Sequence, residues 1–485
     1  MNTPIRRLAY VVIAMFTALL LATTWIQFVT AQDLRERPGN RRTLIDTYNR
    51  ERGAILVDGT AIARSEATNT DLGWIRRYDQ ATRYAHVTGY WSFTYGAGLG
   101  LERARNSVLA GTDDSLFYQR LVDVVTGRPP QGASLELTLD PAVQAAAIEA
   151  LGDRRGAAVA LDPRTGAILA LVSRPSFDPN ALSSHQLTSV DEAYVQLTED
   201  PEKPLVNRAI AGDLYPPGST YKLVVAAAAL ESGEYQPDTE LEGGLTYTLP
   251  GTSTTLPNFG GAACDPDGRP TLARSIQVSC NTSFAWLADQ LGADELREQS
   301  ARFGFGQQLE IPMSVTPSTY PEDPDDAQVA LTGIGQHEVR VTPLQVAMVA
   351  SAIANDGELM TPYLIEAVRN RDLEVIEETG PRTLSRSVSA STAEALTEMM
   401  VSVVEAGSGT SAQIPGMRVA GKTGTAEYGS SGGAHAWFTG FAPADDPQIA
   451  VAVIVESATD NWTGETGGLV AAPVARAMLE AGVQR

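Results

Sequence analysis

The sequence predicts an α+β protein with a five-stranded antiparallel sheet covered by helices, a helical subdomain, a small N-terminal module and one N-terminal transmembrane helix. Three observations lead to this fold class. Residues 8–29 form a long run without a charged residue. Apolar, β-prone runs joined by short turns occupy residues 156–173 and return at 417–456. Residues 175–415, between these runs, are mostly helix-forming or loop-forming, which is the pattern of one sheet built from both ends of a domain.

The bulk composition indicates a globular protein with more than one domain. The chain has 485 residues, a length that corresponds to about two or three domains. Its net charge of −22 argues against nucleic acid as a partner, because the phosphates would repel it. The same charge argues against binding of the folded domains to anionic lipid surfaces.

Residues 8–29, LAYVVIAMFTALLLATTWIQFV, predict a membrane anchor. A helix of this length spans roughly 33 Å at about 1.5 Å per residue, enough to cross the hydrocarbon core. Arg6 and Arg7 precede the run, which predicts a cytoplasmic tail at 1–7 and an extracytoplasmic remainder in the cell membrane. The alternative is a signal peptide cleaved at Val29-Thr30-Ala31, although the run is longer than a signal core of about 7 to 15 residues.

A small N-terminal module is expected at residues 34–134, after a polar linker that runs to about residue 53. AILVDGTAIA at 54–63 predicts two short strands around an Asp-Gly turn. GAGLG at 96–100 falls short of the G-x-G-x-x-G dinucleotide motif and is interpreted as a plain turn. The module shows no set of catalytic residue types, so we expect it to act as a pedestal and docking surface.

Residues 135–485 are expected to form the larger domain. Asp140 and Pro141 are the residue types of an N-cap and a first helical position. The run at 156–173 predicts a hairpin around the Asp-Pro-Arg-Thr-Gly turn that it contains. Further strands are predicted at 417–427, 435–443 and 448–456, followed by a C-terminal helix. The first and last helices of the domain would cover one sheet of about five strands.

The stretch DLYPPGSTYKLVVAAAALESG, residues 213–233, contains the first candidate catalytic pair. The composition from Ser219 to Glu231 favours a helix, and Gly233 suits its C-cap. Lys222 would then project one turn beyond Ser219, on the same face. A buried, neutral amine beside a hydroxyl can act as its general base. The alternative is an N-cap serine with an exposed lysine.

Lysine is rare in this chain, and two of the three lysines fall in motifs. The lysines are Lys203, Lys222 and Lys422, and the other 33 of the 36 basic residues are arginine. An arginine stays charged at any working pH, whereas a buried amine can lose its proton. Lys422 lies in AGKTGTAE, and Lys203 lies in the polar EDPEKP, where a solvated loop charge is expected.

A third motif, Ser279-Cys280-Asn281, lies between the two lysine motifs. Together the residues could carry out acyl transfer. Ser219 Oγ would attack a carbonyl, and Lys222 would take its proton after desolvation and the charge of Lys422 lower its pKa. Ser279 could relay a proton to the leaving nitrogen, and Asn281 could hold a substrate amide and orient Lys222.

The Lys422 strand could bind the substrate. Lys422, kept charged, would bind a substrate carboxylate with the hydroxyls of Thr423 and Thr425. Gly424 would let the substrate lie close to the edge of the 417–427 strand, where it could pair with the backbone. The backbone N–H groups of Ser219 and Thr425 could form an oxyanion hole, with each donor contributing about 3 to 4 kcal/mol.

The cysteines and histidines suggest no rival site. Cys264 and Cys280 could form a disulfide in an oxidising compartment, which would contribute roughly 3 kcal/mol, or they could be two separate buried thiols. The histidines have no metal-ligand spacing, so we expect neither a metal site nor a cofactor. We expect structural or rim positions for His337 and His435, and strand packing for Trp437 and Phe438. The four histidines are His86, His185, His337 and His435.

The three motifs, S-x-x-K, S-x-N and K-T-G, resemble those of penicillin-binding proteins and β-lactamases. The likeness extends to RGAILVDG at 52–59, GAGLGLE at 96–102, LAGT at 109–112 and long stretches after residue 137, so it covers nearly the whole chain after the anchor. The chain is similar to class B penicillin-binding proteins, most of all to the actinobacterial penicillin-binding protein A type. The resemblance implies the penicillin-binding transpeptidase fold and a serine D,D-transpeptidase that cross-links peptidoglycan stem peptides ending in D-Ala-D-Ala to a neighbouring amine.

The resemblance also implies acylation of Ser219 by β-lactams and membrane partners from wall synthesis or the divisome. The S-x-N motif has Cys280 at its middle position, so a disulfide with Cys264 would tie a loop to the motif. Two alternatives use the same residues: a hydrolase of the carboxypeptidase or β-lactamase type, and a non-catalytic penicillin-recognising sensor or scaffold. A β-lactamase needs a base for its deacylating water, for which no carboxylate motif is evident, and a scaffold does not need three intact motifs.

Overall fold

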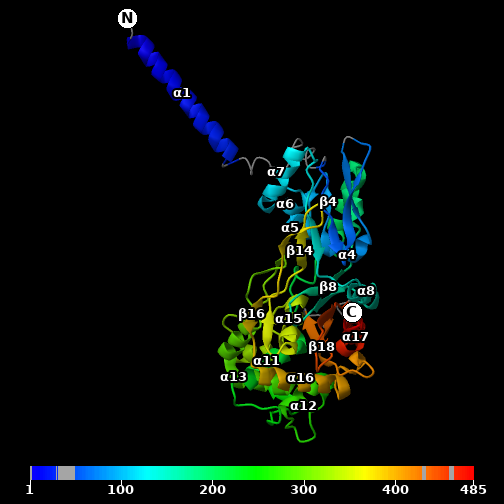
Figure 1. Cartoon of the computed structure of the whole chain (residues 1–485). Helices are drawn as coiled ribbons and strands as arrows, with labels where there is room; N and C mark the ends of the chain where they lie inside the picture. Colours follow the sequence, from blue (N-terminus) through cyan, green and yellow to red (C-terminus); the bar gives the residue numbers. More distant parts are fainter. Residues whose placement is uncertain are drawn as a thin grey trace.

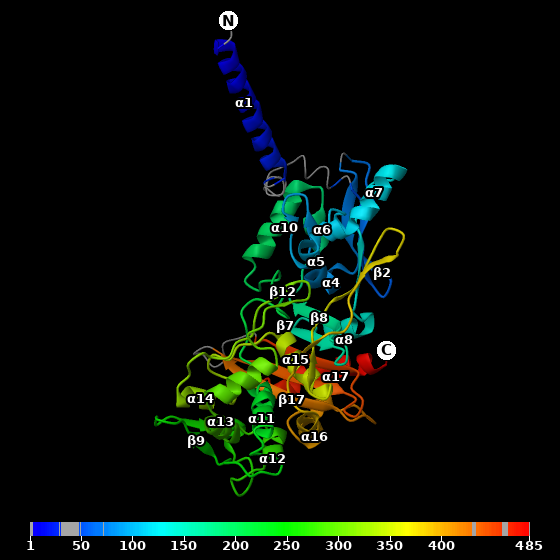
Figure 2. The ribbon, with the colours of Figure 1, turned by 60° about the vertical axis from the view of Figure 1, so that its left-hand side comes forward.

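The computed structural model is elongated, and a small module lies between a lone N-terminal helix and a larger domain in both views (Figures 1 and 2). It describes residues 3–28, 30, 48, 50–70, 72–428, 433–457 and 464–484. The polar linker expected before residue 53 and the alternative cleavage site at 29–31 lie mostly outside these described residues.

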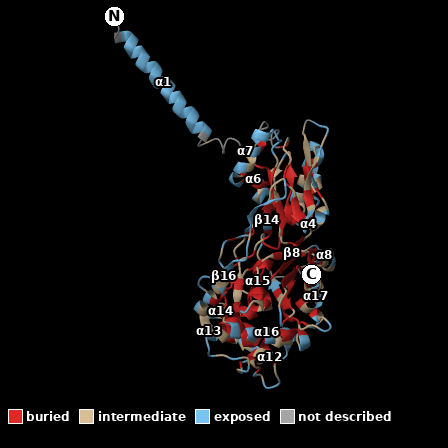
Figure 3. Ribbon diagram, in the orientation of Figure 1, coloured by how far each residue is buried: buried red, intermediate tan, exposed pale blue. Residues whose placement is uncertain are grey.

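The N-terminal helix α1 (Thr3–Phe28) is long and apolar enough to cross a membrane. Its apolar segment, Pro4–Gln27, has a mean hydropathy of 2.0 and none of it is buried by the rest of the protein. Figure 3 shows the helix exposed along its length, whereas the strands of the five-stranded sheet in the larger domain are mostly buried. A bare apolar helix needs a lipid environment, so α1 fits a single-pass membrane anchor.

The larger domain is built on a five-stranded sheet in which all neighbours are antiparallel, as the sequence predicts. The hairpin expected at 156–173 and the three later strands meet in this sheet, and β17 forms one edge. Asp140 caps the helix that follows it, accepting hydrogen bonds from the backbone N–H groups of Ala142 and Val143 at 2.8 and 3.0 Å. The sheet order is β17 (Ala420–Tyr428), β18 (Gly433–Ala442), β19 (Ile449–Val455), β7 (Gly156–Leu161) and β8 (Ile168–Arg174).

Helices cover both faces of this sheet. On one face, α8 (Pro141–Leu151) and α17 (Ala472–Val483) share a hydrophobic core with the strands, which confirms the predicted covering by the first and last helices. On the other face the strands pack against a subdomain of mostly helical structure. Its helices are α11 (Lys222–Glu231), α12 (Leu272–Gln277), α13 (Asn281–Arg302), α14 (Asp326–Thr332), α15 (Pro343–Ala354) and α16 (Ala390–Ala406).

The module contains a six-stranded sheet that the sequence predicts only in part. The Asp58-Gly59 hairpin is present as β1 and β2, with both turn residues at positive φ. Two segments from beyond residue 134 join the same sheet: β6 pairs in parallel with β1, and β14 pairs antiparallel with β6. The order is β15 (Val375–Glu378), β14 (Ile365–Arg369), β6 (Ser134–Leu137), β1 (Ile55–Val57), β2 (Thr60–Ala67) and β3 (Trp74–Tyr78).

Short elements complete the described fold. GAGLG, expected to be a plain turn, consists of the two-residue strand β5, a bend at 98–99 and the first residue of the short helix α5. The helices are α4 (Ala81–Thr88), α5 (Gly100–Ala104), α6 (Asn106–Leu109), α7 (Phe117–Thr126), α9 (Pro179–Ser183) and α10 (Leu187–Glu199), with turns at η1 (Asp114–Leu116), η3 (Phe259–Gly261), η4 (Thr410–Ala412) and η5 (Gly467–Ala471). The short strands are β4 (Trp91–Ser92), β5 (Gly96–Ala97), β9 (Thr246–Thr248), β10 (Thr255–Pro257), β11 (Leu309–Glu310), β12 (Ser314–Val315), β13 (Glu358–Met360) and β16 (Thr383–Arg386).

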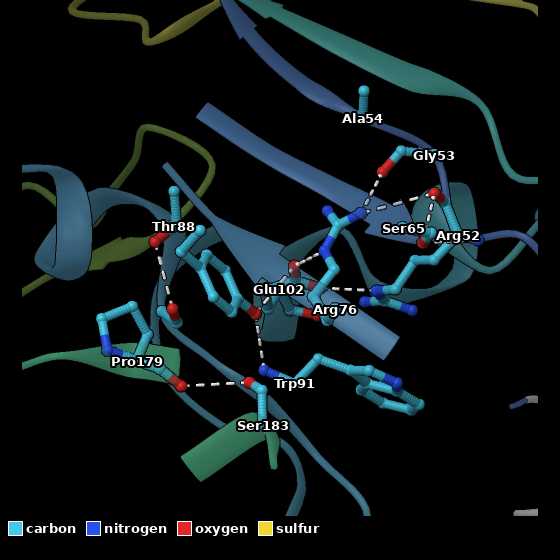
Figure 4. Close-up of polar contacts among 12 residues, drawn as sticks. Arg52, Gly53, Ala54, Ser65, Arg76, Thr88, Trp91, Glu102, Pro179 and Ser183 are labelled. Atoms are coloured by element: carbon cyan, nitrogen blue, oxygen red, sulfur yellow. Dashed lines mark hydrogen bonds and ion pairs between the residues drawn. The ribbon is translucent and has the colours of Figure 1, made fainter. Parts of the chain in front are cut away.

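A buried charge cluster holds the start of the module together (Figure 4). The carboxylate of Glu102 accepts hydrogen bonds from Arg52 Nε at 2.5 Å and Arg76 Nε at 2.6 Å, and from the Tyr78 hydroxyl at 3.1 Å. Burial alone would raise the pKa of Glu102, but the two guanidinium groups bring it below its usual value. The carboxylate therefore stabilises the fold above the usual carboxyl range, and this contribution is lost as the pH falls through the depressed pKa.

Replacing Glu102→Ala leaves two buried guanidinium groups without their counter-ion, so we expect it to lower the free energy of unfolding by about 3 to 5 kcal/mol. The matched control is Glu66→Ala, which removes an exposed carboxylate that also pairs with two arginines and is expected to cost about 1 kcal/mol or less. Urea denaturation followed by circular dichroism measures both. Equal effects of the two variants would contradict a dominant role for the buried cluster.

Candidate active site

Ser219 lies on a tight 3₁₀ turn, η2 (Gly218–Thr220), immediately before α11. The sequence predicts the α-helix to begin at Ser219, whereas it begins at Lys222. Gly218 has a φ of 54°, and the Thr220 hydroxyl donates to the carbonyl of Pro217 at 2.8 Å. These local features tighten the first turn and leave the Ser219 side chain half-exposed at the positive end of the helix.

Backbone contacts from distant segments fix this turn. The N–H of Gly218 donates to the carbonyl of Gly335 at 3.0 Å. A Cβ on Gly335 would lie 2.1 Å from the carbonyl oxygen of Gly218, so only glycine permits this approach. The indole N–H of Trp437 donates to the carbonyl of Pro216 at 3.1 Å. The turn that carries Ser219, which we call the catalytic turn, therefore packs closely against β18 and the Gly335 loop. Contacts from distant parts of the domain fix the position of Ser219.

Lys222 is completely buried and holds the S-x-N motif. Its Nζ donates to the carbonyl oxygen of Ser279 and to Asn281 Oδ1, both at 2.8 Å, and lies 3.4 Å from Ser279 Oγ. Burial, and then the nearby Lys422, lower the pKa of Lys222 well below its ordinary value. This is the direction and the pair of causes expected from the sequence. The alternative of an exposed lysine at this position is wrong.

The contacts of Lys222 also define where its lone pair can point. A neutral amine has two N–H bonds and one lone pair. Two carbonyl-type oxygens at 2.8 Å take the two N–H bonds, so the lone pair remains available for a proton from a third direction. Among the described residues, Lys222 makes no hydrogen bond to Ser219, the other residue of the S-x-x-K motif.

The S-x-N motif sits at the start of α13 in a constrained conformation. Ser279 has a φ of 61°, a left-handed value that non-glycine residues rarely adopt outside special sites. Cys280 forms a disulfide with Cys264, so the pairing is confirmed and the alternative of two free thiols is wrong. The side chains of Ser279 and Asn281 are half-buried and face the lysines, while Cys280 is directed into the loop behind them.

Asn258 is a positioning residue that the sequence analysis missed. Its Oδ1 accepts hydrogen bonds from the backbone N–H groups of Asn281 and Thr282, both at 3.0 Å, so it caps α13 from a distant loop. Its amide nitrogen donates to the carbonyls of Gly244 and Ala262. Asn258 lies 23 residues before Asn281. Capping patterns in a sequence involve neighbouring residues, so nothing in the sequence around LPNFG indicates this cap.

Lys422 reaches the same serine from the edge strand. Its Nζ donates to Ser279 Oγ at 2.8 Å and to the carbonyl of Thr423 at 3.0 Å. Burial lowers the pKa of Lys422 to about 7. Desolvation disfavours the ammonium, and the hydrogen-bond partners of Lys422 among the described residues are neutral; that Lys422 stays charged remains a prediction. A substrate carboxylate would raise this pKa again.

The other residues of the strand have distinct surroundings. The Thr423 hydroxyl shares a hydrogen bond of 2.5 Å with the hydroxyl of Ser408, a partner that the sequence analysis did not identify. A Cβ on Gly424 would lie 3.0 Å from Trp437 Cβ and 3.1 Å from Thr220 Cγ2. The structure thus gives Gly424 a packing role toward the protein interior. Thr425 is half-buried on the edge strand, and its carbonyl would lie 2.9 Å from a Cβ on Gly218.

A pocket of about 500 Å³ adjoins the catalytic turn. Glu456 lies in its wall and accepts hydrogen bonds from the Tyr215 hydroxyl at 2.7 Å and Arg208 Nε at 2.8 Å. His435 packs edge-on against the Tyr215 ring, and burial lowers its pKa to about 4. These residues brace the chain just before Ser219. Lys203 is exposed and pairs with Asp213 at 3.1 Å, as expected for a loop charge.

The histidines and aromatic residues behave as structural groups. His86 is buried with its Nε2 2.8 Å from the carbonyl oxygen of Pro204. His337 lies in the loop after Gly335 with a φ of 60°. Trp437 and Phe438 are fully buried strand residues, which confirms the packing role expected for them.

Comparisons with known proteins agree with the geometry. Residues 156–480 match the model of the family described as "Penicillin binding protein transpeptidase domain", and residues 52–135 match that of the "Penicillin binding protein A dimerisation domain". The sequence is 42% identical to the peptidoglycan D,D-transpeptidase PbpA of Mycolicibacterium smegmatis over 493 aligned residues, which cover 100% of this chain and 99% of that protein. PbpA of Mycobacterium tuberculosis H37Rv is equally similar over the same coverage.

Solved structures of related proteins share the fold. Penicillin-binding protein A from M. tuberculosis, as a ceftriaxone acyl-enzyme complex, superposes with a TM-score of 0.87 and 41% identity over 91% of this chain and 100% of that one. The penicillin G acyl-enzyme complex of the same protein has a TM-score of 0.85 with 41% identity over 90% of this chain and 100% of that one.

The role of Asn258 can be tested with two substitutions. Asn258→Ala removes the cap of α13, so the S-x-N motif should shift and the rate of acylation by a fluorescent penicillin should fall by about tenfold or more. Asn258→Asp keeps the accepting oxygen but turns a second oxygen toward the carbonyls of Gly244 and Ala262, so it should restore the rate only in part. The acylation rates of both variants are measured from time courses quenched at intervals, at several penicillin concentrations. An Asn258→Ala protein that acylates at the original rate would show that the cap does not position the motif.

Proposed function

The chain belongs to the penicillin-binding proteins with a transpeptidase domain, and from that premise we propose that Ser219 carries the acyl-enzyme of its D,D-transpeptidase reaction. The enzyme cross-links peptidoglycan stem peptides and is acylated by β-lactams. The observation that carries the proposal is the placement of two buried lysine amines, Lys222 and Lys422, within 3.4 and 2.8 Å of one serine hydroxyl, that of Ser279.

Acylation begins with attack of Ser219 Oγ on the carbonyl between the two terminal alanines of the donor stem. Lys222 takes the hydroxyl proton, because its amine is neutral and its lone pair is not used by the S-x-N motif. The backbone N–H groups of Ser219 and Thr425 stabilise the oxyanion. This step joins Ser219 Oγ to the carbonyl carbon in a tetrahedral adduct and leaves Lys222 as an ammonium beside Ser279. The Ser219 ester bond forms when the bond to the leaving nitrogen breaks.

Expulsion of the terminal D-Ala requires a proton on its nitrogen. Ser279 Oγ lies within reach of both amines, so it can give its hydroxyl proton to the leaving nitrogen and recover one from the Lys222 ammonium. Lys422, as an ammonium, and the hydroxyls of Thr423 and Thr425 bind the terminal carboxylate of the donor. Asn281 orients Lys222 through its side-chain oxygen and can offer its amide to the substrate backbone.

The second half-reaction transfers the acyl group to an amine of a neighbouring stem. Lys222, neutral again after the release of D-Ala, accepts the proton of the attacking amine and returns it to Ser219 Oγ as the ester bond breaks. The free edge of β17, at the end of the described sheet order, offers a place for the donor stem to pair along the 417–427 strand. Gly424 keeps this strand close to Trp437 and Thr220, so its contribution to substrate binding is through the shape of the strand.

We further propose a topology in which residues 1–7 are cytoplasmic and the module and transpeptidase domain lie outside the cell membrane. Arg6 and Arg7 before α1 support this orientation. A boundary near residue 134 separates the module at 34–134 from the transpeptidase domain at 135–485, although strands of the second part complete the sheet of the first. The module is the proposed docking surface for membrane proteins of wall synthesis or the divisome.

The need for a neutral amine is testable with a matched pair of substitutions. Lys222→Arg places a permanently charged guanidinium at the position of the base, so labelling by fluorescent penicillin should be abolished, as it should be by Ser219→Ala. Lys203→Arg, the same exchange at the exposed lysine, should leave labelling unchanged. Gel fluorescence after incubation measures all three proteins. Normal labelling of the Lys222→Arg protein would overturn the assignment of the base.

The two lysines should also give acylation a bell-shaped dependence on pH. At low pH protonation of Lys222 removes the base, and at high pH Lys422, whose pKa burial lowers to about 7, loses the charge that binds the substrate carboxylate. In Lys422→Arg the guanidinium stays charged, so the alkaline limb should disappear while the acid limb remains. The second-order rate constant of penicillin acylation across the pH range measures this, and an unchanged alkaline limb would assign it to another group.

A further experiment separates cross-linking from hydrolysis. The full chain is incubated with a stem-peptide donor ending in D-Ala-D-Ala and an amine acceptor, and the products are resolved by mass spectrometry. We expect the cross-linked peptide to exceed the hydrolysed donor at saturating acceptor. Hydrolysed donor alone would support a carboxypeptidase, and rapid turnover of the penicillin adduct would support a β-lactamase.

A further inference from the structure

Helix α7 of the module has its apolar side chains on the outside. The polar side chains of Gln119, Arg120 and Asp123 face the module, and Asp123 is buried. The outward residues are strongly exposed, with Tyr118 and Val124 at 80% and Val125 at 78%. A surface helix normally shows the opposite distribution. The six exposed apolar residues of α7 are Phe117, Tyr118, Leu121, Val122, Val124 and Val125.

A second segment, far away in the sequence, extends the same apolar surface. The β14–β15 hairpin exposes Leu373 at 62%, with Val375 and Ile376 also exposed. Ion pairs hold this hairpin beside α7: Arg371 lies 3.7 Å from Asp123, and Arg128 lies 3.7 Å from Asp372. We call the nine apolar residues of α7 and the hairpin the apical patch. Exposed apolar patches built from several elements mark interaction sites in proteins that otherwise bury such residues.

The apical patch lies where the chain enters the module from α1. Gln131 lies five residues after the end of α7 and forms an isolated β-bridge with Glu51. The N–H of Gly132 donates to the carbonyl of Glu51 at 2.9 Å. In both views α7 lies at the end of the module toward α1 (Figures 1 and 2). Residues 29–49 separate α1 from Arg50 and could span about 70 Å if extended, so the tether alone does not fix how the module meets the membrane.

The charge of the chain is unevenly distributed in a way that suits this position. Residues 1–134 contain 16 arginines and 12 acidic residues, whereas the rest of the chain contains 20 basic and 46 acidic residues. Residues 135–485 therefore carry a net charge of −26, whereas residues 50–134 of the module, with 10 arginines and 9 acidic residues, are close to neutral. The expectation that the folded domains do not bind anionic lipid assumes that the negative charge is spread evenly over the chain, so it does not apply to the module.

We propose that the apical patch inserts shallowly into the outer surface of the bilayer that α1 crosses. Its apolar and aromatic side chains on one face of a short helix, with polar side chains on the other, have the composition of an interfacial helix, and Tyr118 is a residue type that favours the membrane interface. Lipid contact would remove this surface from water and hold the module upright on the membrane. The proposal rests on the proposed anchoring through α1.

The test places a single environment-sensitive probe on the patch in the full chain. The two native cysteines are joined in a disulfide, so Val124→Cys supplies one reactive thiol for a nitrobenzoxadiazole label. The protein is reconstituted as single copies in nanodiscs of phosphatidylcholine and phosphatidylglycerol. We expect a blue-shifted emission and strong quenching by lipids brominated on their acyl chains. The matched control is Ser391→Cys, an exposed position on α16 at the far end of the molecule (Figure 1), whose label should report water.

A second pair of variants tests whether the apolar side chains cause the insertion. With the label at Tyr118→Cys, the additional substitutions Val124→Asp and Val125→Asp should abolish the blue shift and the quenching. These side chains are exposed, so acylation by fluorescent penicillin should stay unchanged and show that the protein is folded.

The outcomes separate the possible occupants of the patch. A label at position 124 that reports water in nanodiscs would overturn the proposal while leaving the anchor intact. A blue shift in crowded vesicles that is absent from single-copy nanodiscs would overturn it in favour of a second copy of the chain. A labelled chain that is not retained in the nanodisc at all would show that the anchoring through α1 has failed, and with it the inference.

Discussion

The burial of two lysine side chains around one serine hydroxyl is the constraint on which the rest of the site depends. Full burial of a charge is costly unless it is compensated, and the recorded partners of Lys222 and Lys422 in the described part of the chain are carbonyl, amide and hydroxyl oxygens. Both pKa values therefore fall, and that of Lys222 falls further because Lys422 is its neighbour. In the proposed mechanism, the same desolvation that destabilises the ammonium favours Lys222 as the base, and an anionic ligand would favour the charged form of Lys422.

The fold around this pair buries both amines completely. Lys222 Nζ lies 5.6 Å from the centre of the Phe284 ring, and the disulfide and Asn258 hold the loop that closes over the S-x-N motif. The turn that carries Ser219 is held through its backbone, by the Gly335 carbonyl and the Trp437 indole; among the described residues no hydrogen bond of the Ser219 side chain contributes. A reactive hydroxyl can therefore remain unengaged while its position stays fixed, which is what preorganisation of a nucleophile requires.

Local patterns in the sequence were sufficient for the central sheet and for the motif residues. The Asp140 cap, the alternating apolar runs and the Ser219 and Lys222 spacing each depend on neighbours within a few residues. What the sequence did not reveal depends on contacts between distant segments. The joining of β6 and β14 to the module sheet, the capping of α13 by Asn258 and the pairing of Ser408 with Thr423 leave no periodic or capping signal of their own. The 3₁₀ start at Ser219 also follows from a distant contact, since Gly218 is positioned by Gly335.

The shared sheet gives the two parts of the protein a mechanical relationship that a linker would not. β6 pairs with β1 of the module and leads directly into α8, and the β14–β15 hairpin leaves the transpeptidase domain between α15 and α16 to form the edge of the module sheet. The β14–β15 hairpin belongs by sequence to the transpeptidase domain, but its apolar residues form part of the apical patch on the module. Because backbone hydrogen bonds join β6 to β1 and β14 to β6, the two parts of the protein are connected by a shared sheet and not by a linker alone.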